Sequence, residues 1–497
     1  MQKISNLFLN IFILLAGITV MRGQEISAVI KDSLTKEAIP FATIYLSSGK
    51  GIITNIEGRF KMQYDASKQL DDSLFISCMG YKTIGYPIKS FKDSIVFLPS
   101  KTIALGSIIL SNKNLSAEDI IKEVKKNIAE KYELDLTHKK IFFRESGSQE
   151  FKKLRVKVKK SSIKEFNQAF WDSTLLKIPR KNEWHTEVSG NLYGDFSKEN
   201  QKLEIDRALE LEDKKTTAIF NNIEKAFDTI LKQNIKKDSY FKLRMGLIST
   251  KLEDVELNSS EKDTLTPEEK LVKEKESFSK WRKRIITNIV SVLFEKEMLS
   301  ISVLKKSNRY DFERLDFTYF NNTPVYILKF KPSGNEDYAG KLYIDADEMT
   351  LLRAEYKNIK DIRDISLLGF SFKHYFKEIA IQFKKTASGK YALQYIEAID
   401  QFETGVNRAF SILEKNKVVK GRNKQNELKM ELNFRTNQFQ KYQMVVFESE
   451  RITQEIFDAF KEKPSILPVN LIQYDPTFWE GYTIIEPNQA IKEFKVE

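Results

Sequence analysis

Period-two alternation of apolar and polar residues marks the C-terminal part of the sequence, from about Tyr310 onward. It is clearest in the segments PVYILKF and LKMELNF, where every second side chain is apolar. Because successive side chains of a β-strand point to opposite faces of a sheet, such segments give one apolar and one polar face. The sequence therefore predicts an antiparallel β-meander over residues 301–497, with one face solvated or lined by other elements. The last aromatic and Pro-rich stretch, YDPTFWEGYTIIEPNQAIKEF, is expected to pack back on this sheet as an irregular strap.

Shorter strands broken by turn signals fill residues 24–112. EISAVIKD, FATIYLSS and DDSLFISCMGY are the clearest of them, each bounded by Gly, Pro, Ser, Asn or Asp. Short strands at this regular spacing predict a small β-sandwich of the immunoglobulin-like kind.

Residues 113–300 mix helical and strand patterns. A helix is expected to start after Ser116, with Ser116 as its N-cap and Asp119 three residues on. Apolar residues recur at helical spacing over 217–235, and Pro267 followed by two Glu predicts another helix start. The expected fold class is therefore β-rich α+β, a β-sandwich followed by a larger antiparallel-sheet region with several helices.

The first residues, 1–23, have the pattern of a secretory signal peptide. Lys3 precedes an apolar run from Leu7 to about Val20, and small residues follow toward Gly23. The expected protein is exported, and periplasmic or associated with the outer membrane. An uncleaved N-terminal anchor is the alternative.

Net charge indicates which partners the protein could bind, and cysteine content indicates whether it can form a disulfide. The formal net charge is +12 at pH 7, which favours anionic partners such as lipopolysaccharide or acidic glycan. Nucleic acid is not expected, because an exported protein rarely meets it. The single cysteine, Cys78, excludes an intramolecular disulfide, and its apolar neighbours predict a small buried side chain rather than a nucleophile.

Residues 24–112 also resemble the carboxypeptidase-regulatory-like domain, a transthyretin-like β-sandwich. The segments that carry the resemblance are ISAVIKD from Ile26, IPFATIYL with Pro40, GIITNIEGRF with Gly58, and DSLFISCMGY with Gly80 and Tyr81. The resemblance implies a scaffold module found at the N-terminus of exported envelope proteins of Gram-negative bacteria. It covers less than a fifth of the chain.

A weaker resemblance lies in GKLYIDADEMTLLRAEYK, a hairpin that is similar to the half-barrel repeat of LolA-like lipoprotein-localisation domains. It implies a concave sheet face that could hold a lipid or an acyl chain.

The stretch GIITNIEGRF is best interpreted as a hairpin turn. Thr54, Asn55 and Gly58 lie in the turn, with Asn55 and Gly58 expected to take the unusual backbone angles and Phe60 to return to the core. A phosphate-binding loop is excluded by the missing Lys-Ser/Thr pair.

Catalytic patterns are missing from the sequence. The three histidines, His138, His185 and His374, form no zinc-binding spacing, and no G-x-S-x-G segment occurs. The name of the regulatory-like module does not imply peptidase activity, because the catalytic domain that it accompanies elsewhere is missing. Asp345 and Asp347 are expected to lie in a turn with their side chains in water. No cofactor or metal is expected.

The sharpest charge feature is KKLRVKVKK, in which Arg155, Lys157 and Lys159 alternate with apolar residues. It predicts a half-buried strand whose basic side is either simply solvated or a ridge that binds anionic lipid headgroups or acidic glycan. The segment WRKRIITNIVSVLF is expected to be a buried helix next to solvated charge, with a membrane-surface helix as the alternative.

These observations predict an exported, non-enzymatic protein that binds or scaffolds a glycan, a lipid or a protein partner at the outer membrane. Its association with the membrane would be peripheral rather than integral. A LolA-like carrier of lipid or lipoprotein is one alternative, and a hydrolase with an unrecognised carboxylate site is another.

Overall fold

The computed structural model describes residues 24–48, 50–101, 115–246, 248–252, 265–295, 298–299, 301–315, 317–321, 323–419, 421, 423–463 and 466–496. The contacts divide the chain into two compact units. The first is Met1–Ser100 with Pro476–Asn488, and the second is Lys101–Asp475 with Gln489–Glu497. The expected signal peptide, 1–23, and the expected boundary at residue 112 lie outside the described residues.

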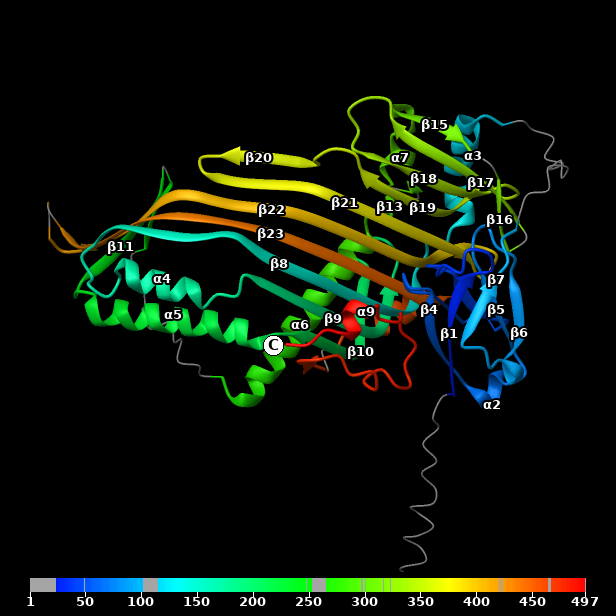
Figure 1. Ribbon diagram of the computed structural model, residues 1–497, viewed down its shortest axis with the longest axis horizontal. Coiled ribbons are helices and arrows are strands. Elements are labelled where there is room, and N and C mark those ends of the chain that lie inside the picture. The colour runs from blue at the N-terminus through cyan, green and yellow to red at the C-terminus, as the bar shows by residue number, and fades with distance from the viewer. Residues whose placement is uncertain are drawn as a thin grey trace, which may run out of the picture. The chain divides into compact units, whose positions relative to one another are not determined.

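The first unit contains two small sheets, one in the strand order β4-β1-β7 and the other in the order β3-β2-β5-β6 (Figure 1). Their elements are β1 (Gln24–Asp32), β2 (Thr43–Leu46), β3 (Gly51–Ile53), β4 (Arg59–Tyr64), α2 (Ala66–Gln69), β5 (Ser73–Ser77), β6 (Ile84–Pro87), the short 3-10 helix η1 (Ile88–Ser90) and β7 (Ile95–Leu98). Alternate residues of β1 are buried from Ile26 to Asp32, as period two requires.

The segment Pro476–Asn488 belongs to the first unit, although it follows the large sheet in the sequence. Its side chains Trp479, Ile484 and Ile485 are buried at 1% exposure each. The Gln63 N–H donates to Thr483 Oγ1 over 3.3 Å, which ties the segment to β4. The strap was expected to pack on the large sheet of the second unit. Its middle part instead completes the core of the first unit, because its buried apolar side chains are placed there.

The second unit is built on one fifteen-stranded sheet, with the main strand order β15-β17-β18-β19-β21-β22-β23-β8-β9-β10-β24. Strands from both sides of residue 300 pair within it, so the two regions predicted as 113–300 and 301–497 share one sheet. Its strands are β8 (Thr137–Ser161), β9 (Lys181–Gly194), β10 (Gln201–Glu212), β11 (Ser239–Met245), β12 (Ile248–Leu252), β15 (Tyr310–Arg314), β16 (Thr318–Phe320), β17 (Thr323–Pro332), β18 (Tyr338–Asp345), β19 (Thr350–Asn358), β20 (Arg363–Leu367), β21 (Phe370–Lys385), β22 (Tyr391–Asn416), β23 (Lys424–Arg451) and β24 (Val469–Leu471).

Helices and a small hairpin accompany this sheet. They are α3 (Ala117–Lys131), α4 (Gln168–Leu176), α5 (Lys214–Asn234), α6 (Pro267–Val290), β13 (Phe294–Glu295), β14 (Met298–Leu299), α7 (Ser302–Lys305), the 3-10 helix η2 (Ser307–Arg309), α8 (Gln454–Ala459) and α9 (Gln489–Lys492). The predicted helix starts are confirmed. Ser116 accepts from the Asp119 N–H at 3.1 Å, and Thr266 forms a capping box with Glu269 ahead of Pro267.

Four long strands, β21, β22, β23 and β8, run side by side in Figure 1, with α4 and α5 lying along the same direction next to β8. β22 has 26 residues and β23 has 28, so these two strands form a long hairpin. The coarse prediction of a β-rich α+β protein with a large, mainly antiparallel sheet is confirmed. Among the helices that the structure describes, none combines the length and the apolar character that a bilayer crossing requires.

Candidate functional site

One face of the long strands collects basic side chains from four strands. Antiparallel pairing places Lys160 of β8 opposite Lys429 of β23, and Lys429 opposite Ser411 of β22. Ser411 is in turn opposite Arg244 of β11. Because directly opposed residues of neighbouring strands share a face, these side chains form one row across the sheet.

The neighbouring rows across the sheet also contain basic side chains. Leu413 of β22 lies opposite Lys242 of β11, which lies opposite Lys251 of β12. Lys157 of β8 lies opposite Glu431 of β23. We call the whole surface the basic face; its cations are Lys153, Arg155, Lys157, Lys159, Lys160, Lys242, Arg244, Lys251, Lys429 and Arg435, and its carboxylates are Glu150, Glu403, Glu427 and Glu431.

Small side chains make the middle of the basic face flat. Along β22 the positions on this face are Gly405, Asn407, Ala409 and Ser411. Asn407 and Ala409 are exposed, as are all the cations of the face except the half-buried Lys242. A broad ligand could therefore lie on β22 and meet cations from the strands on both sides.

The predicted ridge is the β8 border of this face. Arg155, Lys157 and Lys159 are exposed, whereas Val156 between them is buried, as the alternation predicted. Lys159 falls at a break in the strand register and pairs with Glu431 at 2.9 Å. The hydrogen bond from Lys159, assisted by the charges of Lys157 and Arg155, holds the pKa of Glu431 below its ordinary value.

Glu427 is the most strongly paired carboxylate of the face. Lys429 lies 2.8 Å from it and Lys160 3.2 Å, and Lys424 is a third partner. Its burial acts to raise the pKa, but the hydrogen bonds from the three lysines prevail and lower the pKa to about 2. Glu427 therefore stays ionised and fixes these lysines in position without matching their combined charge.

The opposite face of the same strands is apolar and is covered by helices. Val156, Ile163, Phe166, Leu428 and Met430 form a buried cluster there. The partly buried residues that pack against this cluster come from α4, α5 and the sheet: Val158, Phe170, Trp171, Leu175, Phe227, Ile230, Leu231, Phe410, Ile412, Leu432 and Phe434.

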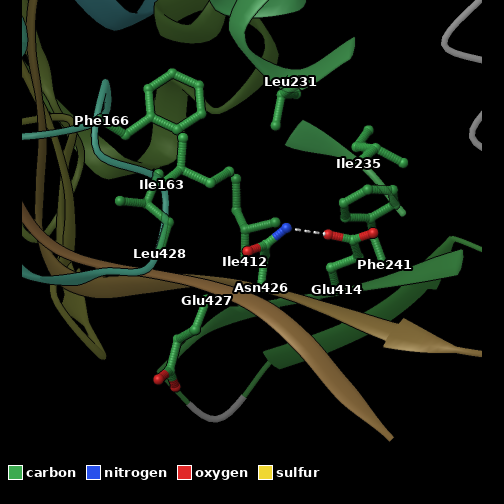
Figure 2. Close-up of a pocket in the computed structure, with 10 residues that line it drawn as sticks. All are labelled: Ile163, Phe166, Leu231, Ile235, Phe241, Ile412, Glu414, Asn426, Glu427 and Leu428. Carbon is green, nitrogen blue, oxygen red and sulfur yellow. Dashed lines mark hydrogen bonds between the residues drawn. The ribbon is translucent and has the colours of Figure 1, made fainter. Parts of the chain in front are cut away.

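A cavity at the end of this cluster is shown in Figure 2. Its free volume of about 20 Å³ is enough for roughly one water molecule. Asn426 Nδ2 donates to Glu414 Oε2 over 2.7 Å at its border, while the Glu427 carboxylate points away from it. The apolar side of the sheet is thus well filled at this point.

A second, open hollow of about 440 Å³ lies where α6 meets β10 and β24. Glu210, Lys214 and Glu274 contribute charge to it, and Phe278 and Trp281 contribute aromatic surface. Burial, followed by the charge of Glu212, raises the pKa of Glu210. The helix that was predicted to be buried is only partly so. Arg282 is buried and forms an ion pair with Glu145, whereas Trp281 is exposed.

A buried polar row crosses the sheet closer to its other end, and the sequence patterns did not reveal it. Arg144 and Glu187, exposed by 1% and 0%, pair at 2.5 Å between β8 and β9. Glu397 of β22 accepts from Tyr395 at 2.8 Å and from Gln443 at 2.9 Å. The only signal in the sequence is a charged residue inside otherwise apolar strand text, as in FFRES.

The three histidines do not come together as metal ligands. His138 lies 2.9 Å from Asn191 Oδ1, His185 lies 2.8 Å from Ser146 Oγ, and His374 lies 2.9 Å from Asp400. Within the described ranges, no group of three or more His, Cys, Asp or Glu side chains could hold a metal ion.

Asp345 forms a turn, as predicted, but its side chain is not in water. It is 6% exposed and accepts from the N–H groups of Asp347 and Glu348 at 2.9 Å each. The Tyr391 hydroxyl donates to it over 3.1 Å, and burial raises its pKa. Its role is to close the β18–β19 turn.

The GIITNIEGRF turn is present, with one correction. Gly58 takes a positive φ of 71°, and Phe60 is buried at 1% exposure. Asn55 is not among the described residues with positive φ. Its side-chain oxygen accepts from the N–H groups of Glu57 and Arg59 at 2.9 Å each, so it stabilises the turn by hydrogen bonding.

The remaining residues of the predicted motif lie around the same unit. Thr54 Oγ1 donates to the Ile39 carbonyl beside Pro40 at 2.9 Å, Gly80 has φ 83°, and the Tyr81 hydroxyl donates to Asp32 at 2.9 Å. Cys78 is only partly buried, against the prediction of a buried side chain, because its position in the chain comes directly after the end of β5.

Comparison with known proteins gives no relative on which to base a function. No family model matches the chain. No curated protein matches it. Among solved structures, it is similar over 66% of its length to the Pseudomonas aeruginosa MucA/MucB complex (93% of that chain, 7% identity, TM-score 0.16). It is also similar over 86% of its length to a protein of unknown function from Bacteroides fragilis (97% of that chain, 10% identity, TM-score 0.13). Similarities at these TM-scores carry no argument about fold or function.

Proposed function

We propose that this protein is an exported, non-enzymatic envelope protein that binds a polyanionic partner on its basic face. The observation that carries the proposal is the excess of cations over carboxylates on one flat, exposed surface built from five strands. The partner would present closely spaced phosphates or carboxylates, as lipid headgroups and acidic glycans do.

The spacing of a β-sheet supports this function. Neighbouring strands are about 4.8 Å apart, and alternate residues of one strand are roughly 6.7 Å apart. Both spacings are shorter than the screening length of about 8 Å at physiological ionic strength. The potentials of neighbouring lysines therefore add, and the surface attracts a multivalent anion more strongly than a simple ion.

The arrangement of the carboxylates also favours binding over mere solubility. Glu427 and Glu431 hold lysines in place from within the face. A polyanion would meet side chains that are already ordered, which reduces the entropy lost on binding.

The two alternatives have less support. A carrier of acyl chains needs an apolar pocket of about 300–1,000 Å³. The described cavity beneath α4 and α5 is about 20 Å³, and the hollow of about 440 Å³ beside α6 is open to solvent and carries charged side chains. A hydrolase would need converging acids, and the hollow beside α6 offers Glu210 and Glu274 together with Lys214. Among the described contacts, neither Glu210 nor Glu274 is paired with a side chain that could act as an activated nucleophile or as a base.

The first unit would serve as a scaffold module of the carboxypeptidase-regulatory-like type. Its two small sheets, the turn at Gly58 and the buried Phe60 are consistent with a transthyretin-like β-sandwich. The binding role would fall to the second unit, because all the strands of the basic face belong to it.

The proposal is tested by substituting two separate borders of the basic face in the full chain. One variant carries Arg155→Gln, Lys157→Gln and Lys159→Gln, and the other carries Lys242→Gln, Arg244→Gln and Lys251→Gln. Both should elute from immobilised heparin, and from immobilised lipopolysaccharide, at clearly lower salt than the wild-type chain, because counterion release scales with the number of contacts.

A matched control loses the same formal charge elsewhere. Lys122, Lys126 and Lys280 are exposed by 75%, 75% and 77% and lie on α3 and α6. Their triple substitution by Gln should leave elution near that of the wild-type chain. Equal shifts for all three variants would show that net charge alone governs retention, and the basic face would then have no special role.

A further inference from the structure

The hairpin that joins β22 to β23 presents two aliphatic side chains to solvent next to the basic face. Val418 is 74% exposed and Val419 is 53% exposed. Because Val418 and Val419 are adjacent in the sequence, together they present a small apolar surface at the hairpin end. They are also β-branched residues in a turn segment, where Gly, Asn and Asp are the usual choices.

Local hydrogen bonds hold this exposed conformation. The Asn416 side-chain oxygen accepts from the Val418 N–H at 2.8 Å and from the Val419 N–H at 2.9 Å. The Lys417 N–H donates to the Asp238 carbonyl over 2.6 Å, which fixes the hairpin end against the residues that precede β11. These hydrogen bonds hold the backbone of Lys417, Val418 and Val419 in place.

Cations lie on the strands that lead to these valines. Lys415 and Lys424 are opposite each other at the end of the β22–β23 pairing. The first cations of the basic face toward the sheet centre are Lys242 and Lys251, followed by Lys429. At about 3.3 Å per residue, these cations begin within roughly 10 Å of Val418. Apolar side chains at the end and lysines behind them match the depth profile of an anionic membrane surface.

We propose that the β22–β23 hairpin inserts Val418 and Val419 into the interface of an anionic phospholipid bilayer while the adjoining cations of the basic face contact its headgroups. This inference rests on the proposed function and names the source of the anions as a lipid surface. Membrane association is then peripheral, through one hairpin, and depends on both apolar insertion and negative lipid charge.

The test uses the full chain and vesicles of phosphatidylcholine mixed with phosphatidylglycerol, compared with vesicles of phosphatidylcholine alone. Wild-type protein should sediment with the mixed vesicles and remain in solution with the neutral ones. The double variant Val418→Ser, Val419→Ser should lose about tenfold or more in vesicle affinity, the amount expected for withdrawing even one fully buried valine. Its salt of elution from heparin should not change.

A matched control removes two exposed valines elsewhere. Val272 and Val292 are 55% and 58% exposed, and the substitutions Val272→Ser and Val292→Ser should leave vesicle binding unaltered. Insertion is read directly by replacing the native thiol (Cys78→Ser), introducing Val418→Cys and attaching an environment-sensitive dye. Its emission should shift to the blue with the mixed vesicles.

The outcomes separate the two proposals. Heparin retention without vesicle binding would overturn the membrane inference and leave polyanion binding standing, with a glycan as the favoured partner. Vesicle binding that survives the double valine substitution, or a dye that remains in water, would also overturn it. A wild-type chain that binds neither heparin nor vesicles would overturn both.

Discussion

Replacing Gly58 tests whether one backbone position governs the first unit. Gly58 has φ 71°, in the left-handed region that favours glycine. A Cβ built there would lie 2.4 Å from the Ile30 carbonyl oxygen, far inside van der Waals contact. The same two residues are joined by a hydrogen bond of 2.7 Å from the Ile30 N–H to the Gly58 carbonyl, so the backbone cannot move away without weakening it.

The expected cost of Gly58→Ala has two parts. The left-handed conformation costs a side-chain-bearing residue about 1–2 kcal/mol. Relieving the clash adds about 1–3 kcal/mol, as overpacking generally does. The sum, roughly 2–5 kcal/mol, is a large share of the 5–15 kcal/mol that stabilises a typical domain. The bulkier Gly58→Val should therefore unfold the unit.

Gly481 provides the matched control in the same unit. Its φ is 81°, and nothing lies within 4 Å of a Cβ built on it, so Gly481→Ala carries the conformational cost without the clash. Hydrogen exchange of the amides of β1, measured by mass spectrometry on the full chain, reports the opening of this unit separately from the other. Gly58→Ala should lower the free energy of opening at least about twice as much as Gly481→Ala. Equal effects would refute the role assigned to the clash, and no effect of either would refute the argument from φ.

Two further predictions concern ionisable groups of the second unit, the buried Arg144–Glu187 pair and the partly buried His185. Arg144→Ala should destabilise the unit by about 3–5 kcal/mol, measured by denaturant unfolding, because Glu187 is left buried without its cation. The double change Arg144→Met, Glu187→Leu should lower the free energy of unfolding by less than Arg144→Ala does. A larger loss for the double variant would contradict the explanation. Burial lowers the pKa of His185 to about 4, below its ordinary value near 6.5, so the unfolded chain takes up a proton at a higher pH than the folded chain does. Stability should therefore decline as pH falls from about 6.5 to about 4, and His185→Gln should reduce that decline; identical pH profiles for the two proteins would exclude His185 as a cause.

Strands and helices can be predicted from the sequence where they depend on the spacing of residues within one segment. Alternation in LKMELNF places Leu428, Met430 and Leu432 on one side, and the structure buries that side under α4 and α5. The N-caps Ser116 and Thr266 depend only on residues three positions away. The turn at Gly58 can be predicted for the same reason. The prediction that the backbone of Asn55 takes an unusual conformation is wrong, because Asn55 stabilises the turn through hydrogen bonds of its side chain.

The extent of the candidate site could not be predicted in this way. The sequence showed Arg155, Lys157 and Lys159 as a ridge on one strand. Whether other cations join them depends on which strands pair and in which register, and a shift of one residue would turn each strand's charges to the opposite face.

By itself the sequence determined the β-rich class, the helices α3, α5 and α6 and the existence of a basic strand, since these follow from spacing along one segment. It did not reveal α4 (Gln168–Leu176), which covers the apolar side of the same strands. Only the tertiary structure decided that Lys160 and Arg244 belong to one surface, because β22 and β23 carry the pairing from β8 to β11. It also decided that Trp479 completes the core of the first unit rather than the large sheet. Contacts between segments far apart in the chain are set by the packing of complementary surfaces, and no local pattern encodes them.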